Sequence, residues 1–143
     1  MMDMNGIAPA PDDDTAALPV GPVVVSVCVS CRADGVVVGP DLFGAVTALM
    51  GDDPAVKVRG VQCLGVCKRP ATVAVTSPDG YTFLFGDLQT DSGAAALTSF
   101  VAAYRVANYG LVPWRARADV LRKGMVARVP PQRWSPDDGA APK

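Results

Sequence analysis

The sequence predicts an α/β domain, and three patterns along the chain support this fold class. Two β-branched apolar runs are separated by a segment with helical periodicity, which is typical of a β-α-β unit. Two shorter β-rich runs then flank a turn signal, and a second amphipathic segment follows them. We therefore expect the order β-α-β-β-β-α, with helices packed on a small mixed sheet. A chain of 143 residues is long enough to bury such a core.

The first three elements form the expected β-α-β unit. A strand is expected within "GPVVVSVCV", residues 21–29, and it ends at Cys28. The helix covers residues 41–51, with Asp41 as its N-cap and turn signals in the loop before it. The alternating run "AVKVRGV", residues 55–61, predicts the second strand, which leads directly into a second cysteine-bearing segment.

The second half of the chain continues with a hairpin, a helix and a basic extension. The hairpin turns at "SPDG", residues 77–80, and the second helix covers residues 90–110. The domain should therefore span residues 21–110, after a disordered leader of residues 1–20 that is rich in Ala, Pro and Asp. Residues 111–143 are expected to form an irregular basic C-terminal extension with a short helix and a short extended piece. About 12 residues at its end are expected to be mobile.

Composition and charge argue against several classes of protein. The net charge of −1 gives no general reason to expect binding to nucleic acid or to an anionic membrane. The N-terminus lacks the basic region and apolar run of a secretory signal, and no stretch approaches the roughly 18 apolar residues of a membrane helix. We therefore expect a cytoplasmic protein, in a compartment that keeps thiols reduced.

The four cysteines form two pairs in a chain that contains no histidine. Cys28 and Cys31 form a CxxC pair, and Cys63 and Cys67 form a CxxxC pair. Each pair follows one strand of the predicted β-α-β unit, whose strands run parallel. Neighbouring strands lie about 4.8 Å apart, so the two pairs are expected to converge at one edge of the sheet. The lack of histidine removes the usual triad and imidazole base, and we do not expect an enzyme.

Four converging thiols are compatible with several chemistries. Structural disulfides are disfavoured in a reducing compartment. A thioredoxin-type redox pair needs its CxxC at the start of a helix, whereas a loop separates Cys31 from the predicted helix. A zinc site of four cysteines is a serious alternative, although zinc ribbons usually pair two CxxC units. An iron–sulfur cluster fits best, because a [2Fe–2S] cluster takes two thiolates per iron; a [4Fe–4S] cluster also takes four cysteines, so the count leaves it open.

Four segments carry a resemblance to known proteins: "VCVSCR", "CLGVCKRPATVAV", "YTFLFGDL" and "GLVPWRARADVLRKGMVARVPP". The second and third resemble the thioredoxin-like [2Fe–2S] ferredoxins. Together, over about residues 22–131, the four resemble more closely a bacterial family of unknown function that is regarded as metal-binding. The resemblance implies a thioredoxin-like ferredoxin fold, with metal ligands at Cys28, Cys31, Cys63 and Cys67. In the better-studied ferredoxins the first two cysteines are more widely spaced than in CxxC.

The resemblance also implies a function and a cofactor. It implies a ferredoxin-like electron carrier or cluster-bearing accessory protein with a [2Fe–2S] cluster, and zinc is the alternative cofactor. Genes of cobalamin synthesis and cobalt handling often lie beside those of the family, which suggests a link to metal metabolism. The expected partner is a redox or metal-pathway protein. Related ferredoxins are often dimeric, and the apolar hairpin of this chain permits a homodimer. A metal-handling module and a thioredoxin-like thiol oxidoreductase are the alternative functions.

Three residues near the second cysteine pair are candidates for tuning or docking. Gly65 permits backbone N–H groups to approach inorganic sulfide, and such hydrogen bonds tune a cluster's potential. Lys68 and Arg69 follow the last cysteine. They either offset the negative charge of a cluster, meet an acidic partner, or simply lie in a solvated loop.

Overall fold

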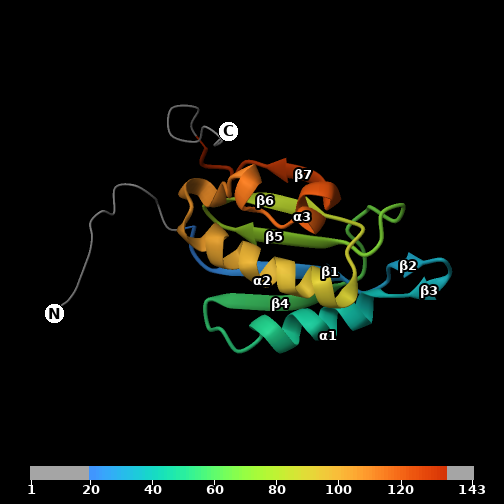
Figure 1. The fold of residues 1–143 in the computed structure, drawn as a ribbon. Coiled ribbons are helices and arrows are strands. Elements are labelled where there is room, and N and C mark those ends of the chain that lie inside the picture. Colours follow the sequence, from blue (N-terminus) through green and yellow to red (C-terminus); the bar gives the residue numbers. More distant parts are fainter. Residues whose placement is uncertain (1–19, 135–143) are drawn as a thin grey trace.

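A five-stranded mixed sheet organises residues 20–134, which are the residues that this computed structural model describes (Figure 1). In sheet order the strands are β4 (Val56–Val61), β1 (Val23–Cys28), β5 (Val73–Ser77), β6 (Gly80–Phe85) and β7 (Met125–Val129). β1 runs parallel to β4 and antiparallel to β5, and the other neighbours are antiparallel. A separate hairpin consists of β2 (Arg32–Ala33) and β3 (Val36–Val37).

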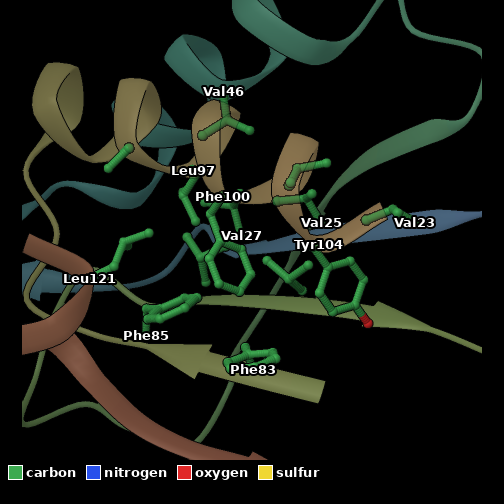
Figure 2. Packing of buried hydrophobic residues seen from close by; sticks show 14 of the residues in the cluster. Val23, Val25, Val27, Val46, Phe83, Phe85, Leu97, Phe100, Tyr104 and Leu121 are labelled. Atoms are coloured by element: carbon green, nitrogen blue, oxygen red, sulfur yellow. The ribbon is translucent and has the colours of Figure 1, made fainter. Parts of the chain in front are cut away.

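Two long helices lie on the same side of this sheet. α1 (Gly39–Met50) and α2 (Thr90–Val106) pack against each other, and both share one core with the inward-facing valines of β1 (Figure 2). The short elements after α2 are η2 (Asn108–Gly110), η3 (Trp114–Ala116) and α3 (Asp119–Gly124). In the described part of the chain, no helix is both long enough and apolar enough to span a bilayer.

The predicted β-α-β unit is present, with β1 and β4 as parallel neighbours. Its helix begins at Gly39 rather than at Asp41. Pro40 suits the first turn of a helix, because the N–H that proline lacks would have no helical partner there. Gly39 and Pro40, which were expected in the loop before the helix, therefore form the first turn of α1. The N-cap is Val38 instead of Asp41, and it makes no side-chain hydrogen bond.

The short helix and the short extended piece expected in the C-terminal extension are present as α3 and β7, and both pack into the domain instead of forming an irregular extension. The hairpin at residues 77–80 is confirmed by β5 and β6, and α2 ends at Val106, before the expected position. Within residues 111–129, Leu121 of α3 is fully buried, and β7 pairs with β6 as the fifth strand. This pairing satisfies the backbone groups that β6 would otherwise expose as an edge strand.

Two predictions concern the ends of the chain. The expected disordered leader lies outside the described residues, except for Val20, which is buried. Residues 135–143 of the expected mobile end lie outside them as well.

The core is built around aromatic side chains between β6 and α2 (Figure 2). The ring centroid of Phe100 lies 5.0 Å from that of Phe83 and 5.1 Å from that of Phe85, both in edge-to-face geometry. Such pairs contribute about 0.5–1.5 kcal/mol beyond the burial of their area. Tyr104 is fully buried beside them, and its hydroxyl donates a 2.6 Å hydrogen bond to the backbone oxygen of Tyr81. This contact ties α2 to β6.

The buried hydroxyl of Tyr104 should make stability depend on alkaline pH. Burial raises the pKa of Tyr104 from 10 to about 12. Between these values the unfolded tyrosine ionises while the folded one does not, so the stabilisation is complete below pH 10 and is lost as the pH rises toward 12. Between pH 10 and pH 12 we expect the free energy of unfolding of wild type to fall by up to about 2 kcal/mol more than that of Tyr104→Phe, as measured by urea unfolding. Equal losses in the two proteins would contradict the prediction.

Candidate metal centre

All four cysteines lie at the edge of the sheet where β1 and β4 end. Cys28 is the last residue of β1 and pairs in register with Val61, the last residue of β4. Because the two strands are parallel, the segments that follow them leave the sheet at the same end (Figure 1). The β2–β3 hairpin lies at this end, and so does the loop between β4 and β5.

The first cysteine pair is buried. Cys28 is 3% exposed and Cys31 is 6% exposed. The backbone N–H of Cys28 donates to the oxygen of Thr72 at 3.0 Å, which joins the end of β1 to the start of β5. Asp34 and Gly35 turn the hairpin with positive φ angles of 52° and 81°, as the Asp-Gly sequence predicts. The hairpin thus brings the chain back beside Cys31 before α1 begins.

The second cysteine pair is exposed. Cys63 and Cys67 lie in the loop between β4 and β5, outside regular secondary structure. Gly65 has a φ of +78°, a left-handed conformation that glycine adopts without strain. Its backbone N–H donates to the Cys63 sulfur at 3.2 Å. This contact is to a cysteine sulfur, whereas the approach to inorganic sulfide that the sequence predicts for Gly65 stays a prediction.

The pKa shifts identify the thiols that interact. Burial raises the pKa of Cys28, but hydrogen bonds, chiefly from Cys31 and Ser30, outweigh burial and leave that pKa below its usual value. Burial and the contact with Cys28 raise the pKa of Cys31. The pKa of Cys67 is raised first by its hydrogen bond with Cys63, then by the charge of Cys63, and more weakly by the charge of Cys28. The main contacts that shift these pKa values are therefore within each pair.

The donors are arranged as two pairs of free thiols. All four cysteines are unbridged. Within residues 20–134, no group of three or more His, Cys, Asp or Glu side chains is placed to hold one metal ion. Each thiol instead interacts with the second thiol of its own pair.

The two cations after the second pair have different environments. Lys68 is exposed, and no ion pair joins it to another residue of the described part of the chain. Arg69 is half-buried, and its guanidinium donates hydrogen bonds to Asp87 and to the backbone of the α3–β7 segment. Arg69 is therefore engaged within the domain, whereas Lys68 is exposed.

The sequence did not reveal three polar contacts around the first pair. The Cys31 thiol lies 3.7 Å from the Thr72 hydroxyl, and Cys28 lies 3.6 Å from that of Ser30. Ser30 also donates to the backbone oxygen of Gln62, which links the two cysteine-bearing loops. One sequence feature could have drawn attention to Thr72, since it is a polar residue next to the apolar run of β5. In the structure this side chain is buried, at 1% exposure.

The sheet order, the two helices and the sheet-edge cysteines define a mixed α/β protein with the fold of the thioredoxin-like ferredoxins. The chain belongs to the family described as protein of unknown function (DUF1636), whose sequence profile matches residues 25–131. No curated protein matches the chain.

Two solved structures match the chain, and the first of them shows the likeness of fold. A thioredoxin-like [2Fe–2S] ferredoxin from Aquifex aeolicus superposes with a TM-score of 0.51 at 17% identity, covering 80% of this chain and 99% of its own. A second structure, the wild-type thioredoxin-like [2Fe–2S] ferredoxin from the same organism, gives a TM-score of 0.43 at 19% identity, covering 59% and 85%.

Proposed function

We propose that this protein is a ferredoxin-like electron carrier, or a cluster-bearing accessory protein, with a [2Fe–2S] cluster held by Cys28, Cys31, Cys63 and Cys67. The observation that carries the proposal is the position of the two thiol pairs, which lie in the segments that leave the same end of the parallel neighbours β1 and β4. A [2Fe–2S] cluster takes two thiolates for each iron, and two pairs of thiols match that requirement. When bound, such a cluster supplies a one-electron couple.

The residues around the thiols suit this cofactor. The donor set consists of four cysteine sulfurs, which are the standard protein ligands of a [2Fe–2S] cluster. The N–H of Gly65 already contacts one sulfur and would stabilise its negative charge. The likeness of fold to a protein described as a [2Fe–2S] ferredoxin adds support, and it concerns the fold alone.

The proposal extends to partner and location. Exposed Lys68 beside an exposed cysteine pair suits contact with an acidic region of a redox or metal-pathway protein, or of a second copy of the chain. A link to cobalamin or cobalt metabolism is part of the proposal through the family resemblance. A cytoplasmic location fits four unbridged thiols, because that compartment keeps them reduced. No substrate chemistry is proposed.

The decisive experiment is anaerobic purification followed by absorption and EPR spectroscopy and by analysis of iron, sulfide and zinc. We expect a coloured protein that contains iron and sulfide in equal amounts and gives the EPR signal of a reduced [2Fe–2S] cluster. A colourless protein that holds stoichiometric zinc after attempted cluster reconstitution would overturn the proposal.

A metal-handling module is the second candidate, because the exposure of Cys63 and Cys67 gives metal ions access to the site. It predicts reversible loading and exchange in metal competition, whereas a carrier retains its cluster while it cycles between two oxidation states. A thiol oxidoreductase is the third candidate, because the pKa of Cys28 is lowered. That thiol is buried, however, and a substrate disulfide has little access to it.

Thr72 should tune the potential of a cluster at this site. The Thr72 hydroxyl accepts from the Cys31 thiol and donates to the backbone oxygen of Arg69 at 3.3 Å. A ligating Cys31 sulfur carries no proton, so we expect the single hydroxyl proton of Thr72 to turn from Arg69 to this sulfur and to stabilise the more negative reduced state. We expect Thr72→Val to lower the potential by about 40 mV, the one-electron equivalent of ~1 kcal/mol. Thr72→Ser retains the hydroxyl and should keep the wild-type potential.

Redox titration of the loaded protein measures this effect. Thr76→Val is the matched control, because Thr76 lies on β5 and its hydroxyl contacts the backbone of Val24 instead of a cysteine. A Thr72→Val potential equal to that of wild type, or a Thr76→Val shift of the same size, would refute the role of Thr72.

A further inference from the structure

Arg69 joins the loop that carries the second cysteine pair to the C-terminal part of the domain. Its Nε donates to Asp87 Oδ2 at 2.7 Å. Its two terminal nitrogens donate to the backbone oxygens of Lys123 at 2.9 Å and of Met125 at 3.3 Å. One rigid guanidinium therefore connects three segments that are distant in the sequence, which the single ammonium of a lysine cannot reproduce.

The backbones of these three segments also lie in direct contact. The Arg69 oxygen accepts from the Asp87 N–H at 3.1 Å, and the Gly86 N–H donates to the Gly124 oxygen at 2.7 Å. A Cβ on Gly86 would lie 2.7 Å from the Arg69 oxygen, and one on Gly124 would lie 2.4 Å from the Gly86 oxygen. Both glycines are required by this packing. The segments "KRP", "FGD" and "RKG" of the sequence thus meet at one place.

The loop between β4 and β5 is held at its two ends. At its start, the hydroxyl of Ser30 donates to the backbone oxygen of Gln62. At its end, Arg69 makes the contacts described above. The second cysteine pair lies between these anchors and is exposed, so burial contributes little to its position.

We infer that Arg69 is a positioning residue, which with Asp87 and the backbone of residues 123–125 forms a clamp that fixes the second cysteine pair. This inference rests on the proposed function, because the clamp acts on two of the proposed ligands. Without it, the loop samples a wider range of positions of Cys63 and Cys67, and a bound cluster is lost more readily. The α3–β7 segment is then part of what retains the cofactor, although it contains no ligand.

The test measures how fast a chelator removes iron from the reconstituted protein. We expect Arg69→Gln to release iron about tenfold faster than wild type, since three charge-assisted hydrogen bonds are lost. Arg69→Lys should be intermediate. Asp87→Asn should have the smallest effect, because Arg69 keeps its hydrogen bonds to the backbone oxygens of Lys123 and Met125. Asparagine also tolerates the φ of +58° at position 87.

Arg105→Gln is the matched control. Arg105 forms an ion pair with Asp53 at 2.9 Å, and the two side chains are 40% and 39% exposed. The ion pair of Arg69 with Asp87 is similarly exposed, at 34% and 53%. The Arg105–Asp53 pair, however, lies near the C-terminal ends of α1 and α2. The inference would be overturned if iron were released from Arg69→Gln as slowly as from wild type. It would also be overturned if Arg105→Gln accelerated iron release as much as Arg69→Gln does. Should Arg69→Gln fail to fold, the rank order of Arg69→Lys and Asp87→Asn against wild type decides the question in the same way.

Hydrogen exchange of the apo-proteins separates this inference from the proposed function. We expect Arg69→Gln to increase exchange in residues 62–70 and 123–126, with the core strands unchanged. If wild type binds no cluster but this pattern appears, the proposed function fails while the clamp stands. If wild type binds a cluster but exchange in these residues is unaltered, the clamp fails while the proposed function stands.

Discussion

We expect replacement of either exposed cysteine by serine to remove the proposed [2Fe–2S] cluster and to leave the fold intact. Cys63→Ser and Cys67→Ser each delete one of the four proposed thiolates, and we expect iron and sulfide content to fall by at least about tenfold, because even residues behind the ligands typically contribute that much. Both side chains are exposed, so the change should alter the free energy of unfolding of the apo-protein by no more than about 0.5 kcal/mol.

The buried pair should behave differently. Cys28 and Cys31 are both less than one-tenth exposed and belong to the hydrophobic core. Serine is more polar than a thiol that packs as a small hydrophobe, so Cys28→Ser and Cys31→Ser should lose the cluster and also destabilise the apo-protein by about 1–2 kcal/mol. Iron and sulfide analysis with urea unfolding of all four variants measures both effects. Wild-type spectra in Cys63→Ser and Cys67→Ser would show that the second pair does not ligate.

The sequence was sufficient to predict that each cysteine pair follows one of two neighbouring parallel strands. Two strands joined by a helix run parallel, and this rule alone places Cys28 and the segment after Val61 at one edge of the sheet. The hairpin at residues 77–80 was predictable for a similar reason, since its turn residues are adjacent in the chain. These features depend on local pattern and on the handedness of connections.

Other features depend on contacts that no local pattern contains. β2 and β3 have two residues each, which is too short for an alternating pattern to be detected. The guanidinium of Arg69 contacts residues 18, 54 and 56 positions away, so its role as an anchor was not visible beside Cys67. β7 joined the sheet because β6 offered an unpaired edge, and only the assembled sheet shows that edge.

Gly39 links the start of α1 to the first cysteine pair by close backbone contact. A Cβ on Gly39 would lie 2.2 Å from the backbone oxygen of Cys28 and 2.6 Å from the Cα of Val29. These are backbone atoms at the end of β1, so no side chain can rotate to make room. The helix could accept alanine at this position only if it moved away from the strand, and that movement would displace Cys28.

Alanine at Gly39 should therefore destabilise the protein by about 2–3 kcal/mol, in the range of overpacked cores, and should also lower cluster retention. Gly44 provides the control within the same helix, because a Cβ at that position would have no other atom within 4 Å outside its own helical turn. Gly44→Ala should stabilise the helix by about 0.5–1 kcal/mol and leave the cofactor unaffected. Urea unfolding and iron analysis of the two variants test this directly. The two substitutions should change the free energy of unfolding in opposite directions. Equal urea midpoints for Gly39→Ala and Gly44→Ala would contradict the prediction, because they would mean that α1 does not pack closely against the end of β1.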